Sequence, residues 1–509
     1  MFFRLPVVRF FNRVINRATV TVALVLLQIG WLLWAFFSLT AGKVWVNAGL
    51  NVLSLFITLY LVRKDENSDY KIIWLVLIGM MPLLGGALYL AFGNKAPAKR
   101  MRQRMQAVER QHTADLAQQP GQTDALDPAS RGLSRYVSEY GPYPAWKNST
   151  AKYYPCGEAM YPDLLADLEK AERFIFLEFF IVRTGKMWKG VEDILVRKAA
   201  QGVDVRLIYD DFGSLLGLPS DFVVKMERAH IRCIPFNPVV PLVSLVMNHR
   251  DHRKIVVVDG NTAYTGGINL ADEYINAYEK HGYWKDSSIL LRGDAVWSLT
   301  TMFLTIWESE TGSDENYELY RPTNLYQNDG FVQPFADSPI DWELSGENVY
   351  MNMINSATKS ICIETPYLII DNEMMTALCL AAKSGIRVDI VTPHVADKWF
   401  VHEVTRSNYK QLIQAGVNIY EFTPGFIHAK VVVVDDEYAV VGTQNFDYRS
   451  FYLHFECGVW MYRSSAIQQV SADFKEILKV SQKIALEDCK IPWYKRPIRG
   501  FLKVFAPLM

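Results

Sequence analysis

Three long hydrophobic segments open the chain, at residues 19–40, 44–62 and 72–92, and alternating strand and helix patterns follow them. As helices, the first and third would reach roughly 30 Å and the second slightly less, which matches the hydrocarbon core of a bilayer. The segments are consecutive and almost free of charged residues, which favours membrane helices over buried helices of a soluble domain. No small-residue cleavage site follows the first segment, which disfavours a cleaved signal peptide. The pattern predicts a membrane region over residues 1–104.

The basic residues around these segments predict how they lie in the membrane. Clusters precede the first segment, separate the second from the third and follow the third, whereas the first connection has only Lys43. Three simple spans would place some of these clusters outside, against the positive-inside rule. Two spans and a third segment that dips in and returns would keep all but Lys43 inside, and Pro82, Gly85 and Gly86 could break that third helix. We therefore expect the rest of the chain on the cytoplasmic side.

The remaining sequence divides into four stretches by composition. Residues 105–145 are rich in Gln, Asp and Ala and predict a helical or loose linker. Residues 146–335 and 336–485 alternate between strand and helix patterns and predict two α/β domains. Residues 486–509 mix aromatic and basic side chains. This mixture is typical of an amphipathic segment on an anionic membrane surface, and a plain surface helix that closes the second domain is the alternative.

The two α/β stretches repeat one another. Residues 199–208 and 381–390 each read as a helix end, a Gly stop and a strand, and residues 176–179 and 362–365 are matching strands that both carry Glu. The repeat predicts two similar halves that face one another.

One short motif occurs once in each half. It reads His, any residue, Lys, four residues, Asp, followed at matched spacing by Gly and then Asn. The residues are His252, Lys254, Asp259, Gly266 and Asn269 in the first half, and His428, Lys430, Asp435, Gly442 and Asn445 in the second. Chance rarely repeats a spacing of this length to the residue, so the motif predicts one function for both halves.

The motif borders β-branched runs at residues 255–258 and 431–434, which predict buried strands. Side chains two apart on a strand share a face, so each His is expected beside its Lys. An ammonium repels a divalent cation but attracts a phosphate, so we expect a phosphate site without a metal. Asp259 and Asp435 stand an odd number of residues beyond the Lys, which indicates a structural role.

These residues resemble the phospholipase D superfamily, and more closely the bacterial cardiolipin synthases, over residues 153–462. In the first half the resemblance rests on Asn248, the run 249–254, the run 265–269, Asp272-Glu273-Tyr274 and Trp284-Lys285-Asp286. In the second half it rests on the runs 364–367, 424–430, 442–450 and Phe455-Glu456. The chain departs from the family pattern at His454, where Asn is expected, and in an extra hydrophobic segment at the N-terminus.

The resemblance implies two phospholipase D-like α/β sandwich domains that form one active site, preceded by N-terminal transmembrane helices. The residues it assigns to catalysis are His252, Lys254, Asp259, His428, Lys430 and Asp435, although strand position indicates a structural role for the two aspartates. Asn269 and Asn445 are expected to bind the phosphate, with Asp286, Glu456, Gly266 and Gly442 in supporting positions. By resemblance His252 is the nucleophile and His428 the acid, then base, a distinction that the sequence alone does not make.

The expected reaction transfers a phosphatidyl group between two phosphatidylglycerol molecules, giving cardiolipin and glycerol through a phosphohistidine. No cofactor is expected, and the expected partners are phosphatidylglycerol and an anionic phospholipid membrane. The net charge of −1 disfavours a nucleic-acid partner. The expected location is the bacterial cytoplasmic membrane, with several passes and the catalytic body facing the cytoplasm. A hydrolase that releases phosphatidic acid and a non-catalytic scaffold for anionic lipid are the alternatives, and the oligomeric state is left open.

Overall fold

The computed structural model describes residues 44–65, 67–81, 84–86, 88–89, 93, 99–117, 122–239, 248–341 and 343–508, with four isolated positions between 26 and 38. The chain forms two compact units. The small unit comprises essentially residues 1–97 and 237–249, and the large unit essentially residues 98–236 and 250–507. The repeated motifs lie in the large unit.

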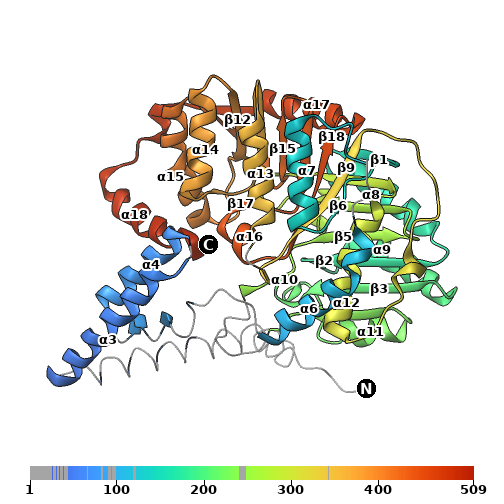
Figure 1. Cartoon of the computed structure of the whole chain (residues 1–509), viewed down its shortest axis with the longest axis horizontal. Helices are drawn as coiled ribbons and strands as arrows, with labels where there is room; N and C mark the ends of the chain where they lie inside the picture. The colour runs from blue at the N-terminus through green and yellow to red at the C-terminus, as the bar shows by residue number, and fades with distance from the viewer. Residues whose placement is uncertain are drawn as a thin grey trace, which may run out of the picture. The chain divides into compact units, whose positions relative to one another are not determined.

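A seven-stranded mixed sheet forms the first half of the large unit (Figure 1). Strands β2, β3 and β4 are parallel to one another, and β5 turns antiparallel against β2. In sheet order the strands are β1 (Ser149–Tyr154), β8 (Ser288–Gly293), β6 (Thr262–Gly266), β5 (Lys254–Val258), β2 (Phe174–Phe179), β3 (Asp204–Asp210) and β4 (Arg232–Phe236).

An eight-stranded sheet forms the second half and repeats this order. Strands β10, β12 and β13 are parallel, and β15 turns antiparallel against β10. In sheet order the strands are β19 (Ser481–Ile484), β13 (Asn418–Phe422), β12 (Arg387–Pro393), β10 (Ser360–Glu364), β15 (Val431–Val434), β16 (Tyr438–Gly442), β18 (Glu456–Tyr462) and β9 (Phe331–Asp337). The predicted pair of similar α/β halves is confirmed.

Helices connect the strands in equivalent places of the two halves. In the first half they are α8 (Gly157–Glu169), α9 (Lys186–Ala200), α10 (Asp211–Ser214), α11 (Phe222–Arg228) and α12 (Val296–Thr311). In the second half they are α13 (Ser345–Ser356), α14 (Asn372–Lys383), α15 (Trp399–Ala415), α16 (Tyr448–Tyr452) and α17 (Ser465–Lys479).

The core explains why the strands that follow the motifs are β-branched throughout. Ile255 and Val257 of β5 lie in one hydrophobic cluster with Val431 and Val433 of β15, together with residues of α12 and α17. The intervening side chains of the two strands lie in two other clusters, under the outer helices of each half. Both faces of each sheet are therefore covered, as expected for strands without polar alternation.

Helices lie in the predicted linker, and a strand crosses the predicted boundary between the two domains. The predicted linker, residues 105–145, contains most of α6 (Lys99–His112) and all of α7 (Pro128–Tyr140). Strand β9 pairs with β18 of the second sheet and begins at Phe331, five residues before the expected boundary at 336. The reason is that β9 closes the second sheet as β1 closes the first.

The small unit contains α3 (Val44–Arg63) and α4 (Ser68–Met80), which pack through Leu61, Tyr70 and Trp74. Helix α4 ends just before Pro82, inside the predicted third segment, so that segment does not form one continuous helix. The predicted first segment, 19–40, lies almost wholly outside the described residues. Among the described helices, none combines the length and hydropathy needed to cross a bilayer.

Candidate active site

Parallel strand pairing between the two halves brings the motifs together. Strand β7 (Tyr283–Lys285) of the first half pairs with β14 (Gly425–Ile427) of the second, and the amide of His428 donates to the carbonyl oxygen of Lys285 at 2.6 Å. In the equivalent place, Asp251 bridges to Phe455, and the amide of His252 donates to the Phe455 carbonyl oxygen at 2.9 Å. Each motif histidine is thus held against a strand of the other half.

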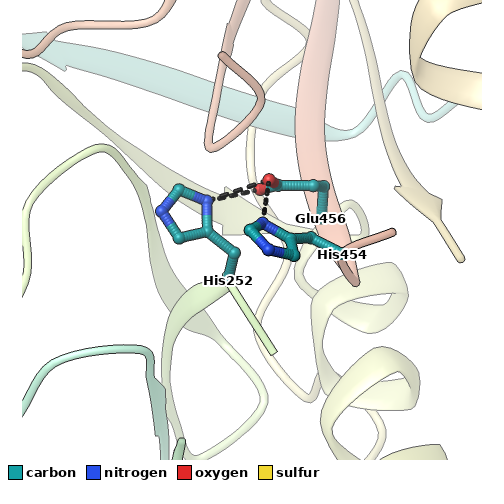
Figure 2. Close-up of side chains that lie close together, drawn as sticks. All are labelled: His252, His454 and Glu456. Atoms are coloured by element: carbon teal, nitrogen blue, oxygen red, sulfur yellow. Dashed lines mark hydrogen bonds and ion pairs between the residues drawn. The ribbon is translucent and has the colours of Figure 1, made fainter. Parts of the chain in front are cut away.

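The histidine–carboxylate pairs are crossed between the halves. His252 Nδ1 lies 2.9 Å from both carboxylate oxygens of Glu456, and His428 Nδ1 lies 2.7 Å from Asp286 Oδ2. Figure 2 shows the first of these pairs, with the Glu456 carboxylate facing the ring of His252. All four side chains are buried. The sequence predicted these two carboxylate partners, but not that each serves the histidine of the opposite half.

A carboxylate at Nδ1 determines what the other ring nitrogen can do. When Nδ1–H donates to the carboxylate, the lone pair of Nε2 is left for chemistry. Burial lowers the pKa of His252 to about 3, against the raising effect of Glu456, and that of His428 to about 4. Burial alone would raise the pKa of Glu456, but the charge and hydrogen bond of His252 hold it well below its usual range. Both free imidazoles are therefore neutral near pH 7.

The two motif lysines form a buried positive site. The ammonium of Lys254 donates to the carbonyl oxygen of His252, and that of Lys430 to the carbonyl oxygen of His428. Burial lowers the pKa of Lys254 to about 8, and burial with the charge of Lys254 lowers that of Lys430 to about 7. Two ammonium groups that disfavour one another become stable when an anion lies between them, so the site suits a phosphate.

The two asparagines of the motif have different surroundings. Asn269 accepts from the amide of Ile181 at 2.9 Å and donates to the Tyr274 hydroxyl at 2.8 Å. The Tyr274 ring in turn packs edge-on against His428, with ring centroids 5.6 Å apart. Asn445 is buried, and its Oδ1 atom finds no hydrogen-bond partner among the described residues. Phosphate binding by both asparagines stays a prediction.

The two motif aspartates lie at the far ends of the strands that follow the histidines. Asp259 accepts backbone N–H groups of residues 172, 173 and 174 at 2.8–2.9 Å, just before and at the start of β2. Asp435 accepts those of residues 358, 359 and 360 at 2.7 Å, just before and at the start of β10. A five-residue strand is about 16 Å long, so these carboxylates tie strand ends together away from the histidines.

The repeated spacing of the motif glycines has a steric cause. A Cβ on Gly266, whose φ is +137°, would lie 2.6 Å from the carbonyl oxygen of Ser287. A Cβ on Gly442 would lie 2.7 Å from the carbonyl oxygen of Cys457. Each glycine thus lets its strand approach the residue that follows Asp286 or Glu456, which is how it supports the site.

Sequence reasoning named the residues that surround the two carboxylates only as parts of the family pattern, or as a departure from it, and assigned them no role. The Thr443 hydroxyl donates to Glu456 at 2.5 Å, whereas the equivalent Gly267 leaves room for Asp286, since a Cβ there would lie 1.9 Å from Asp286 Oδ1. Two residues before each carboxylate stand Trp284 and His454, which flank the motif histidines. Aligning the halves on their carboxylates would have found these pairs.

One group of side chains has the composition of a metal site. The ligand atoms of His252, His454 and Glu456 all lie within 4.8 Å of one another. The ammonium of Lys254 interacts with the same Glu456 carboxylate and opposes a divalent cation there. The donor set therefore fits a resident metal poorly, and a metal-free reaction remains the prediction.

The fold and this paired site define a two-domain protein of the phospholipase D class. The family model described as "Cardiolipin synthase, PLD-like domain" matches residues 164–288 and 350–478, and one described as "Phospholipase D-nuclease N-terminal" matches residues 49–94. The chain belongs to the cardiolipin synthase family, and it is a transferase enzyme.

Individual relatives are similar in sequence to this chain along nearly its whole length. A cardiolipin synthase of Geobacillus kaustophilus is 35% identical and covers 97% of this chain and 100% of its own. One of Alkalihalophilus pseudofirmus is 33% identical over 93% of this chain and 98% of its own, and an uncharacterized protein of Streptococcus mutans is 40% identical over 89% and 99%. The solved phosphatidylserine synthase of Haemophilus influenzae shares the fold, with a TM-score of 0.56 at 15% identity over 75% of this chain and 98% of that one.

Proposed function

We propose that this enzyme transfers a phosphatidyl group from one phosphatidylglycerol to a second, giving cardiolipin and glycerol. The observation that carries the proposal is the pair of crossed histidine–carboxylate contacts beside two buried lysines. The names of the relatives support the product, since several are cardiolipin synthases at 32–35% identity.

The first step forms a phosphatidyl-enzyme. Nε2 of His252 attacks phosphorus, the bond from phosphorus to the glycerol oxygen breaks, and His428 gives its proton to that oxygen. The bound phosphodiester's negative charge raises the pKa of His428 and allows it to hold that proton. Lys254 and Lys430 offset the charge that builds on the nonbridging oxygens. Glycerol leaves, and the phosphatidyl group remains on His252.

The second step is the first step run backwards, with a second phosphatidylglycerol in place of glycerol. The terminal hydroxyl of a second phosphatidylglycerol gives its proton to neutral His428 and attacks phosphorus, and the bond from phosphorus to His252 breaks. One phosphodiester replaces another, so little net energy is needed. Water competes for the same intermediate and would yield phosphatidic acid. The burial of both histidines, 6% and 8% exposed, limits access of water to the bond.

We further propose that the N-terminal region anchors the enzyme in the bacterial cytoplasmic membrane with several passes, the catalytic body facing the cytoplasm. The hydrophobic segments 19–40, 44–62 and 72–92 support this assignment. Described residues that follow α4 support the re-entrant form. A Cβ on Gly85 would lie 2.4 Å from the carbonyl oxygen of Leu77, and the rings of Trp74 and Tyr89 are 5.5 Å apart. Gly85 and Tyr89 thus lie back against α4.

The C-terminal segment supports contact with a membrane surface. In helix α18 (Arg496–Val504), Arg499 pairs with Glu403 of α15 at 2.6 Å, whereas Ile498 and Phe501 are exposed by 55% and 64%. Trp493, in the turn before the helix, is exposed by 78%. Exposed aromatic and apolar side chains among basic ones are typical of helices that lie on anionic leaflets. Deleting residues 491–509 should weaken binding to vesicles that contain phosphatidylglycerol.

Product analysis tests the proposed reaction. Purified enzyme is incubated with phosphatidylglycerol in mixed micelles with a chelator, beside His252→Ala. Cardiolipin and glycerol from the unchanged enzyme alone are expected. Phosphatidic acid as the main product would make the protein a hydrolase, and equal absence of product from both proteins would favour a lipid-binding scaffold.

A further inference from the structure

The two motif histidines have different neighbours at equivalent positions. Trp284, two residues before Asp286, packs beside His428 with ring centroids 5.4 Å apart. His454, two residues before Glu456, packs beside His252 with ring centroids 5.6 Å apart. The first position carries an indole and the second an imidazole, which can donate or accept a proton.

His454 is a largely buried imidazole whose ring nitrogens make no hydrogen bond of ordinary length to the described residues. Its side chain is 10% exposed, and neither ring nitrogen lies within 3.5 Å of a hydrogen-bond partner among the described residues. Its Nδ1 atom points toward Glu456 and lies 3.7 Å from Oε1 (Figure 2). A shortening of about 0.7 Å would give an ordinary hydrogen bond. A polar ring in this state needs a partner, and the Glu456 carboxylate is the acceptor that faces it.

We propose that His454 is a positioning residue that donates a third hydrogen bond to Glu456, beside those of His252 and Thr443, and thereby gives His252 the role of nucleophile. The inference deepens the proposed function and rests on it. It concerns only which histidine receives the phosphatidyl group, not what the acceptor is.

The physical basis is competition for one carboxylate. Glu456 accepts from His252 and Thr443 and faces His454, whereas Asp286 accepts from His428 and the amide of Ser287. Each added donor takes up part of the negative charge of Glu456, so Glu456 stabilises an imidazolium at His252 less. When a bound phosphodiester raises the pKa of both imidazoles, His252 therefore takes up a proton less readily than His428. His252 keeps a free Nε2 lone pair, and His428, paired with Asp286, carries the proton.

Other charges face the same ring. Lys254 interacts with Glu456 from the β5 side, and Asp447 interacts with His454 from the N-terminus of α16. Lys254 and Asp447 carry opposite charges, and neither supplies another imidazole N–H to Glu456 when the donor at position 454 is removed. The effect of removing the donor should therefore be measurable at His252.

The test follows the covalent intermediate in the full-length enzyme. Phosphatidylglycerol with a radiolabelled phosphate is mixed with enzyme, the reaction is quenched in base, and the label is assigned to the peptide of His252 or of His428. His454→Phe keeps a ring but has no donor, and His454→Asn keeps a short donor. His454→Leu is a second variant without a donor, and Trp284→Phe makes a matched change of ring in the other half.

Label on His252 is expected in the unchanged enzyme. Both variants without a donor should form it about 10-fold more slowly and place part of it on His428. His454→Asn should stay within about two-fold of the unchanged enzyme, and Trp284→Phe should leave the label on His252, since the Trp284 indole makes no hydrogen bond to Asp286. Thermal unfolding of each variant confirms that it is folded.

Two results would overturn the inference: label on His252 at the unchanged rate in His454→Phe and His454→Leu, or a loss in His454→Asn as large as in His454→Phe. The first removes any role for the donor, and the second assigns the effect to packing. The label forms whether the acceptor is lipid or water, so failure of the proposed cardiolipin synthesis would be seen separately, in the product.

Discussion

The two halves of the large unit share one strand order and differ in the residues around their carboxylates. From β8 to β4 in the first sheet and from β18 to β13 in the second, six consecutive strands follow each other in the same order. Both halves end their motif strand with an aspartate that binds backbone amides. In contrast, the first half carries Asp286 with Gly267, and the second carries Glu456 with Thr443.

The difference shows how a repeated fold can supply unequal chemistry. A displacement at phosphorus needs one neutral nucleophile and one acid, which two identical halves would not provide. The scaffold is duplicated, and crossed strand pairing places each histidine against the other half's carboxylate. The inequality can then come from a few side chains around the carboxylates, without any change of strand order.

The largest expected effect distinguishes the roles of the two histidines, with two substrates that differ in their leaving group. His252→Ala and His428→Ala should each lower cardiolipin synthesis about 1,000-fold or more, because one lacks the nucleophile and the other the acid. A phosphatidyl substrate with a nitrophenol leaving group needs no acid. His428→Ala should therefore still release nitrophenol in a burst equal to the enzyme concentration, measured by absorbance, and His252→Ala should not.

A burst from His252→Ala with none from His428→Ala would reverse the two roles. Equal bursts from both variants would mean that the halves are interchangeable, against the comparison made above.

The crossed carboxylates give the next effect. Glu456→Gln and Asp286→Asn keep the shape of each side chain but remove its charge, and each should lower turnover about 100-fold. Because Glu456 serves His252, Glu456→Gln should slow formation of the phosphohistidine even with the nitrophenol substrate. Asp286→Asn should slow it only with phosphatidylglycerol. Stopped-flow measurement of the burst rate distinguishes them, and the opposite pattern would show that each carboxylate serves its own half.

The crossing itself was beyond sequence reasoning. Spacing along one strand placed His252 near Lys254 and predicted the buried β-branched runs, because those relations are local. Which carboxylate meets which histidine depends on the pairing of β7 with β14, between segments more than 130 residues apart. The repeat predicted two similar halves but could not specify their register against one another.

Backbone crowding at the motif glycines gives a smaller effect, on stability. Gly266→Ala adds a Cβ at φ +137° and 2.6 Å from a carbonyl oxygen, whereas Gly442→Ala adds one 2.7 Å from a carbonyl oxygen without a positive φ. Gly266→Ala should therefore lower the free energy of unfolding by about 2 kcal/mol more than Gly442→Ala. Denaturant unfolding followed by tryptophan fluorescence measures the difference. Equal losses would show that crowding by the neighbouring strand outweighs the backbone conformation.

The sequence predicted these glycines only as members of a pattern. Their cause lies in the neighbouring strands β8 and β18, whose backbones they touch, and a repeat in one sequence does not reveal what lies beside it. Strand β9 shows the same limit, since it begins before the predicted boundary at 336 but pairs with β18 in space. Local periodicity identifies strands, whereas their partners follow from the fold.

The smallest expected effect is a pH dependence of KM that distinguishes the two lysines. The pKa of Lys430 is lowered to about 7 and that of Lys254 to about 8, in both cases mainly by burial. As the pH rises from 6 to 9, Lys430 loses its proton first and Lys254 next, so positive charge at the phosphate site falls. KM for phosphatidylglycerol should rise about five-fold over this range, since a charge-assisted hydrogen bond is lost.

Arginine keeps its charge, so Lys430→Arg should move the onset of the rise upward by about one pH unit, while Lys254→Arg should leave the onset in place and reduce only its later part. Initial rates across phosphatidylglycerol concentrations at each pH give these values. If Lys254→Arg moved the onset instead, the lysine of the first half would be the one that loses its proton first, and the order of charge in the two halves would be reversed.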